Sequence, residues 1–284
     1  MKTALIDVGG AQRGIYAAGV IDRFMDDGVT FDLGIGVSAG SANIASFISL
    51  QKRRNYMFYT VYSRRDEYMS RQNIRKKGCF LDVAYIYGTL SNSDGENPLD
   101  YQKFVDNPME FLAVATEMDS GAVKYFWKQD LRMDYYNVLM ASSAMPYVCT
   151  PQEVNGTLYF DGSVSDPIPL KKAFSEGCDK VVLILNQPKN MLWSAEEDAH
   201  LASRIQNKYP QIAQALLKRA EKYNQGVALA ESLSEIGKVK IIAPDDICGI
   251  KPLSQDIPSL EALYAKGFHD GAGIIDFLEK AYSR

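Results

Sequence analysis

Histidine is scarce in this sequence. Only His200 and His269 occur among 284 residues. His200 follows an acidic run and His269 lies in a predicted C-terminal helix, where a histidine usually packs against neighbours or faces solvent. The scarcity argues against an enzyme whose mechanism depends on a catalytic histidine.

Closely spaced cysteines are also missing. Cys79, Cys149, Cys178 and Cys248 are scattered, without a C-x-x-C pair and without histidines at metal-ligand spacing. This pattern excludes a disulfide framework and gives no zinc site. We expect reduced thiols that pack as small apolar groups, no bound metal and no cofactor.

The sequence has neither an excess of one charge nor a long apolar run. Its 31 basic and 35 acidic residues give a net charge of -4, which offers no general attraction to nucleic acid. No stretch approaches the roughly 18 apolar residues of a membrane-spanning helix, and no signal-peptide run precedes Asp7. We therefore expect a cytoplasmic protein that meets lipid only peripherally, at a membrane surface, and binds no nucleic acid.

What the sequence does contain is an alternation of short apolar strands with helical patterns, typical of a parallel sheet covered by helices. We expect one domain, residues 1–284, with a helical excursion at about 194–237. The predicted strands are 4–6, 31–37, 111–116, 158–160, 180–185 and 239–243, and the predicted helices are 15–25, 42–50, 135–143, 170–176 and 259–282.

The first motif is Gly-Val-Ser-Ala-Gly at residues 36–40, between an apolar strand and a helix. A serine on such a sharp turn is exposed to substrate, and the glycines leave room for neighbouring backbone. The following helix aims N–H groups at developing negative charge. Ser38 is therefore a candidate nucleophile. A phosphate-binding loop is the alternative, because glycine-rich turns of this kind also bind phosphate.

A second glycine-rich loop, Gly-Gly-Ala-Gln-Arg-Gly at residues 9–14, also joins a strand to a helix. Its backbone N–H groups can form an anion pocket beside Ser38, which in an acyl-hydrolase is the oxyanion hole. The alternative is a dinucleotide loop, although the spacing departs from G-x-G-x-x-G.

The candidate base is Asp161, at the end of the predicted strand 158–160 and followed by Gly162. From this position a carboxylate can project at the same sheet edge as Ser38, and partial burial would raise its proton affinity toward that of a working base. The alternative is an Asp-Gly turn that only closes a hairpin.

Together these segments resemble the patatin-like phospholipase family, which carries G-G-G-x-[RK]-G, then G-x-S-x-G, then a distant D-G-[GA]. Residues 9–14, 36–40 and 161–163 follow this order. Ala-Ser-Ser-Ala-Met-Pro at 141–146 is similar to the family's A-S-x-A-x-P, and 114–117 also matches. The resemblance covers residues 1 to about 188 well and the remainder loosely. It implies a three-layer α/β/α sandwich around a mostly parallel sheet, and acyl ester substrates, typically lipids.

By the same resemblance, Ser38 attacks the ester carbonyl and Asp161 accepts its proton, with no histidine. The oxyanion loop comprises Gly9, Gly10, Ala11, Arg13 and Gly14, and N–H groups of Gly10, Ala11 and Ala39 are expected to hold the oxyanion. Arg13 either braces the loop, meets a phosphate headgroup or forms a surface salt bridge.

Three positions depart from the family pattern. Ala11 replaces the third glycine, which is harmless at negative φ and obstructive otherwise. Ser163 replaces a glycine or alanine, and Asp166 stands where asparagine is common.

Two alternatives remain. The first is an esterase, thioesterase or acyltransferase acting on soluble acyl donors, which would use the same site. The second is a phosphate- or nucleotide-binding module without covalent chemistry.

Basic and aromatic residues at 52–56 and 59–65 suggest either a patch that meets a membrane or a solvated helix.

Overall fold

The structure is a computed structural model that describes residues 1–279. The strands are β1 (Thr3–Asp7), β2 (Leu33–Val37), β3 (Glu110–Glu117), β4 (Val123–Trp127), β5 (Gln152–Val154), β6 (Thr157–Asp161), β7 (Lys180–Ile184) and β8 (Val239–Ile242). The helices are α1 (Ile15–Asp26), α2 (Ala39–Ile48), α3 (Arg54–Thr60), α4 (Arg71–Lys77), α5 (Tyr101–Asp106), α6 (Asn137–Ser143), α7 (Leu170–Ser175), α8 (Ala195–Ile205), α9 (Pro210–Leu216), α10 (Arg219–Glu235), α11 (Ile257–Asp270) and α12 (Ile274–Glu279).

All these strands belong to one sheet with the order β5-β6-β3-β2-β1-β7-β8, and β4 pairs with β3 off this path. Strands β1, β2, β3, β7 and β8 pair in parallel, whereas β4, β5 and β6 run antiparallel to their neighbours. The predicted mostly parallel sheet is confirmed.

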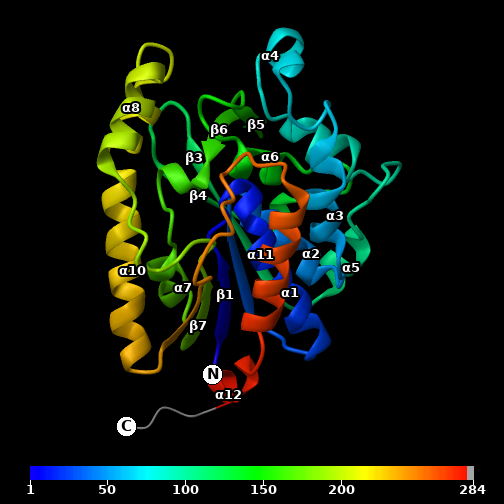
Figure 1. The fold of residues 1–284 in the computed structure, drawn as a ribbon, viewed down its shortest axis with the longest axis vertical. Helices are drawn as coiled ribbons and strands as arrows, with labels where there is room; N and C mark the ends of the chain where they lie inside the picture. The colour runs from blue at the N-terminus through cyan, green and yellow to red at the C-terminus, as the bar shows by residue number, and fades with distance from the viewer. Residues whose placement is uncertain (280–284) are drawn as a thin grey trace.

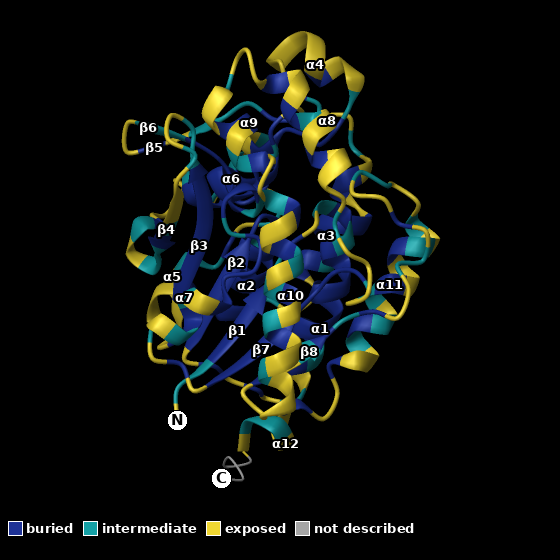
Figure 2. Ribbon diagram, turned by 90° about the vertical axis from the view of Figure 1, so that its left-hand side faces the viewer, coloured by how far each residue is buried: buried dark blue, intermediate teal, exposed yellow. Residues whose placement is uncertain are grey.

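Helices cover both faces of this sheet, because its central strands are apolar on both sides. In β1, Leu5 faces the core that includes α1, α2 and α11. Its neighbours Ala4 and Ile6 face a second core that includes α7 and α10. Figure 1 shows α8 and α10 on one side and α1, α2, α3 and α11 on the other, and Figure 2 shows the buried strands behind α10. The expected three-layer α/β/α arrangement is therefore confirmed.

The direction of β6 brings Asp161, at its end, close to Ser38, which follows the end of β2. Ala115 and Thr116 of β3 pair with both β4 and β6, so β6 must lie on the same side of β3 as β2. Val37, the last residue of β2, pairs with Val114, and Asp161, the last residue of β6, pairs with Ala115. Thus β2 and β6 approach each other end to end along β3. We expected the two strands to end at one edge, but they meet from opposite directions.

Several elements differ from the sequence predictions. Strands β4 and β5 and helices α4 and α5 were not predicted, and α3 was considered only as a solvated helix. The predicted helix 259–282 is broken after Asp270, where Gly273 has a φ of 74° before α12 begins. The last residues of that prediction lie outside the described residues. No helix within residues 1–279 is long and apolar enough to cross a membrane.

Candidate active site

Ser38 occupies the turn between β2 and α2, in a backbone conformation that serine rarely adopts. Its φ is 56° and its ψ is -134°. Such backbone strain persists only where surrounding structure enforces it. A Cβ added at Gly36 would lie 2.2 Å from the Cα of Ser41, and one at Gly40 would lie 2.3 Å from the carbonyl oxygen of Asp7. The glycines of the motif therefore permit the tight packing that holds Ser38 in place.

The side chains of Ser38 and Asp161 form a direct hydrogen bond. Ser38 Oγ donates to Asp161 Oδ2 at 2.6 Å, and the N–H of Ser163 donates to Asp161 Oδ1 at 2.8 Å. Both Ser38 and Asp161 are buried, with relative exposures of 6% and 1%. Burial raises the pKa of Asp161 above its ordinary value, against the opposing effects of these hydrogen bonds and of the Arg219 charge.

The segment 141–146 holds the backbone of both residues. Ser142 Oγ accepts a hydrogen bond of 3.1 Å from the N–H of Ser38, and the carbonyl oxygen of Ala144 accepts one of 2.9 Å from the N–H of Asp161. Thr116 adds a hydrogen bond of 2.8 Å from its hydroxyl to the carbonyl oxygen of Asp161. In the sequence, this segment is recognisable only through the family resemblance.

The loop 9–14 presents two free N–H groups next to the serine. The N–H of Gly9 donates to Asp7 Oδ1 at 2.9 Å, and that of Gln12 donates to the carbonyl oxygen of Pro252 at 3.0 Å. Within residues 1–279, the N–H groups of Gly10 and Ala11 have no acceptor. Gly10 and Ala11 line a cavity together with Ser38 and Asp161. These two donors are thus available for an oxyanion.

The other expected loop residues have different positions. Ala39 begins α2 and lines a cavity with Ser38, so the first turn of this helix faces the same space. Gly14 is buried, and its carbonyl oxygen accepts a hydrogen bond of 3.1 Å from Asn43. Ala11 has a φ of 50°, so this departure from glycine places an alanine in the left-handed region. That conformation costs an alanine about 1 kcal/mol.

Arg13 braces the loop against the C-terminal part of the chain. Its Nε donates to the carbonyl oxygen of Ile250 at 3.0 Å, and its Nη1 donates to Gln187 Oε1 at 3.1 Å. No ion pair between Arg13 and a carboxylate occurs within residues 1–279. Of the roles considered for Arg13, bracing is the one that matches these contacts.

Asp7, which was not among the predicted site residues, fixes the position of the backbone and side chains around the site. Besides Gly9, its carboxylate accepts hydrogen bonds from Asn43 Nδ2 at 2.8 Å and Asn186 Nδ2 at 3.1 Å. Asn186 also donates to the carbonyl oxygen of Gly9. Complete burial raises the pKa of Asp7 to about 6. The signal available in the sequence was an aspartate at a strand end directly before two glycines.

The remaining departures lie beside the dyad. Ser163 contributes its N–H to Asp161 as described and lines the same cavity. Asp166 points elsewhere, because its Oδ2 accepts a hydrogen bond of 2.5 Å from the Tyr125 hydroxyl. Burial raises the pKa of Asp166.

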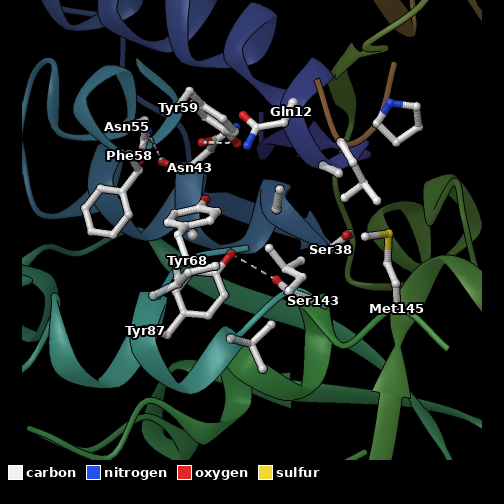
Figure 3. A pocket seen from close by; sticks show the side chains of 18 of the residues that line it. Gln12, Ser38, Asn43, Asn55, Phe58, Tyr59, Tyr68, Tyr87, Ser143 and Met145 are labelled. Carbon is white, nitrogen blue, oxygen red and sulfur yellow. Dashed lines mark hydrogen bonds between the residues drawn. The ribbon is translucent and has the colours of Figure 1, made fainter. Parts of the chain in front are cut away.

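Two cavities open on Ser38. We call the wider one, of about 480 Å³, the mouth. It is also lined by Asp161, Arg13 and Arg219. Arg219 Nε donates to both carboxylate oxygens of Asp198, at 3.0 and 3.2 Å, and the Arg219 guanidinium lies 4.9 Å from the Trp193 ring centre. The narrower cavity, of about 50 Å³, extends from Ser38 along α2 and α3 (Figure 3).

Neither histidine lies at these cavities. His200 is exposed on α8, and the His269 side chain is 90% exposed on α11. Within residues 1–279, no group of three or more His, Cys, Asp or Glu side chains is arranged to hold a metal ion. Of the basic and aromatic segments, Arg54, Tyr59 and Tyr62 are buried, whereas Lys52, Arg53 and Arg64 are exposed.

Comparison with known proteins gives the family directly. The model of the patatin-like phospholipase family matches residues 8–174, which include the elements from α1 through β6 and both members of the dyad. The chain belongs to the patatin-like phospholipase family. A second model, a domain of unknown function (DUF6363), matches residues 209–283.

Two curated relatives of this patatin-like chain are themselves uncharacterized. The protein YjjU of Escherichia coli is 30% identical over 200 residues, 69% of this chain and 55% of YjjU. An NTE family protein of Mycobacterium tuberculosis is 34% identical over 77 residues, 27% of this chain and 20% of that protein. The chain therefore spans about half of the first relative and a fifth of the second.

A solved structure with the same fold is VipD from Legionella pneumophila. The superposition covers 97% of this patatin-like chain and 67% of the VipD chain, with a TM-score of 0.53 and 12% sequence identity. At this identity the likeness supports the fold alone.

Proposed function

We propose that the protein is a serine acyl-hydrolase that cleaves acyl ester bonds of phospholipids or related lipids through a Ser38–Asp161 dyad. The observation that carries the proposal is the 2.6 Å hydrogen bond from Ser38 Oγ to a buried carboxylate that opens on a cavity. A nucleophile within hydrogen-bond reach of a base, with donors for the oxyanion nearby, is the arrangement that acyl transfer needs.

In the first half of the reaction, Ser38 Oγ attacks the ester carbonyl carbon while Asp161 takes the hydroxyl proton. The carbonyl oxygen becomes an oxyanion, which accepts hydrogen bonds from the N–H groups of Gly10 and Ala11. The intermediate collapses, the ester C–O bond breaks, and the proton on Asp161 passes to the departing alkoxide. The acyl group is now an ester of Ser38.

In the second half, Asp161 accepts a proton from water, and the resulting hydroxide attacks the acyl carbon. Collapse of this intermediate breaks the bond to Ser38 Oγ, which regains the proton from Asp161, and the carboxylic acid leaves. The raised pKa of Asp161 supports the base role, since a carboxylate with greater proton affinity accepts a proton more readily.

The proposal includes a peripheral contact with the lipid surface at the mouth. Exposed apolar side chains stand at its rim, and their relative exposures are 44% for Tyr147, 39% for Met191 and 62% for Leu192. Apolar side chains gathered around an entrance are typical of enzymes that draw substrate from a membrane surface. Cosedimentation with phosphatidylcholine vesicles, compared between wild type and Leu192→Ser, measures this contact, and equal binding of both would remove the rim from the proposal.

The decisive experiment measures hydrolysis of p-nitrophenyl esters and phosphatidylcholine by wild type, Ser38→Ala, Asp161→Ala, His200→Ala and His269→Ala. We expect activity to vanish in the first two variants and to persist in both histidine variants. A fluorophosphonate probe should label wild type and not Ser38→Ala, because only an activated serine reacts.

The outcomes also separate the alternatives. Labelling together with activity on thioesters or transfer to an alcohol, but not on phospholipid, would favour a thioesterase or acyltransferase. Absence of labelling in a folded wild-type protein would favour the phosphate- or nucleotide-binding module.

A further inference from the structure

The narrow cavity beside Ser38 is lined by both apolar and polar side chains. Ser38 and Met145 lie at one end, and Asn55 and Phe58 of α3 lie at the other (Figure 3). Its apolar lining includes Leu81, Val83, Ile86, Met145 and Leu253, and its polar lining includes Gln12, Asn43, Arg54, Asn55, Tyr68 and Tyr87. A pocket for a plain alkyl chain needs no such polar side chains, since every buried polar group must find a partner.

Arg54 is the charged member of this lining, and it is 7% exposed. Its Nη1 donates to Ser46 Oγ at 3.1 Å, and its Nη2 donates to Ser91 Oγ at 2.9 Å and to the carbonyl oxygen of Asn97 at 3.1 Å. All three acceptors are neutral. Within residues 1–279, Arg54 Nε has no hydrogen-bond partner and no carboxylate forms an ion pair with the guanidinium.

This arrangement leaves a buried positive charge without a counter-charge. Buried charges are normally paired, because desolvation of an unpaired ion is expensive. The titratable groups that bear on Arg54 are the hydroxyls of Tyr136, Tyr87 and Tyr62 rather than carboxylates, and the guanidinium lies 4.6 Å from the Phe58 ring centre. Burial lowers the pKa of Arg54 to about 10, so it is a cation at neutral pH.

The position of Arg54 sets the length of a group that would reach it from Ser38. Its guanidinium contacts Ser46, which lies eight residues after Ser38 along α2, a rise of roughly 12 Å. An extended acyl chain advances on the order of 1.25 Å per carbon. A chain of about six to eight carbons attached to Ser38 spans roughly 8 to 10 Å, and a hydrogen bond of about 3 Å from its far end covers the rest of the distance to Arg54.

We propose that this pocket selects acyl groups whose far end carries a carboxylate, with Arg54 as its counter-charge. The inference rests on the proposed acyl-hydrolase function and names the substrate class of the same site. A guanidinium suits a carboxylate, and Arg54 Nε, which neighbouring atoms cover almost completely, donates to no residue described here. The apolar side chains of the lining would accommodate the methylene chain between the two ends.

The test compares p-nitrophenyl esters that differ only at the far end of the acyl chain. Half-esters of dicarboxylic acids of about six to eight carbons are assayed beside the matching monoamides and the methyl-terminated esters of equal length. For wild type at neutral pH, we expect kcat/KM to be about tenfold or more higher with the carboxylate than with either neutral end.

Variants connect this preference to Arg54. In Arg54→Met the ratio of carboxylate to methyl-terminated kcat/KM should fall to about one, and Arg54→Lys should retain part of it. The matched control is Arg65→Met, because Arg65 pairs with Glu96 and is not among the residues that line the pocket. Arg65→Met should keep the wild-type ratio.

A wild-type preference for the methyl-terminated or amide esters would overturn the proposal and make Arg54 a tie between α2, α3 and the segment 91–97. This result stands even if Arg54→Met does not fold, since it needs only the wild type. Failure of the proposed function is a different result, in which no ester is cleaved and Ser38 is not labelled.

Discussion

Asp7 and Asp161 each end a strand, and each is almost completely buried with a raised pKa, yet their surroundings differ. The Asp7 carboxylate is enclosed by fixed amide donors from Gly9, Asn43 and Asn186. Asp161 has one fixed donor, the Ser163 N–H, and its other oxygen faces the Ser38 hydroxyl in an open cavity. Burial alone therefore does not make a base; the carboxylate also needs an exchangeable proton and access to substrate.

The sharpest test of this comparison is Asp161→Asn. The amide cannot accept the Ser38 proton, so we expect kcat to fall about a thousandfold or more. The thermal unfolding midpoint should change little, because asparagine keeps the shape of the side chain. The measurement is ester hydrolysis beside thermal unfolding. Activity within a factor of ten of wild type would remove Asp161 from the dyad.

Asp7→Asn should show the reverse balance. It replaces an acceptor of several hydrogen bonds with a group that presents an N–H₂ to other donors, so we expect a loss of about 2 kcal/mol in the free energy of unfolding. Urea unfolding measures this loss. Asp32→Asn, at an exposed residue, is the control and should lose less than about 1 kcal/mol.

The ionisation of Asp7 should make the stability of the wild type depend on pH in a way that Asp7→Asn lacks. The folded pKa of about 6 lies above the ordinary value of 3.8, so the folded state binds a proton more tightly than the unfolded state. This contribution to stability is complete below the ordinary pKa and is lost as the pH rises through about 6. Asp7→Asn should lack this fall, and identical pH profiles for the variant and wild type would contradict the assignment.

The charge of Arg219 should lower the pKa of Asp161. Ionised Asp161 is the active form, and its raised pKa moves the acid limb of kcat/KM above the range of an ordinary aspartate. Because Arg219 favours the ionised form, Arg219→Met should move this limb to higher pH. Arg204→Met, at an exposed residue of the same helical region, should leave it in place.

Asp198 needs its own control in that experiment, because Arg219→Met leaves its buried carboxylate without a partner. The double variant Asp198→Asn/Arg219→Met removes both charges. If the acid limb of the double variant returns to the wild-type position, the unpaired Asp198, rather than the lost Arg219 charge, causes the shift.

The smallest expected effect is at Ala11, in the loop that Asp7 holds. Ala11→Gly relieves the left-handed backbone but adds freedom to the unfolded chain, so we expect stability to rise by at most about 1 kcal/mol. Ala199→Gly, at an exposed position within α8, should instead lose about 1 kcal/mol. Thermal unfolding compares the two, and equal losses would show that Ala11 is unstrained.

The sequence predicts the parts of this molecule that depend on neighbours along the chain. The turns at Ser38 and Asp161 and most strands follow from glycines and apolar runs. Strand β4 was missed because it is partly exposed, and β5 because it has three residues.

Contacts between distant segments were beyond local patterns. The roles of Asn186 and Arg219 depend on pairings with Asp7 and Asp198, which no spacing in the sequence indicates. Arg54 was read as part of a basic surface segment, whereas Ser46, Ser91 and Asn97 enclose it. The antiparallel direction of β6 likewise follows from its pairing with β3.

Strand β3 acts as a common template for the dyad, since it aligns β2 and β6 on consecutive residues, Val114 and Ala115. Ser38 and Asp161 are 123 positions apart. The two residues nevertheless lie close together, because the strands that carry them pair with adjacent residues of β3. Surface insertions between the two motifs can therefore vary in length without moving the dyad, whereas a slip of β6 by a single residue would turn the Asp161 side chain to the opposite face of the sheet.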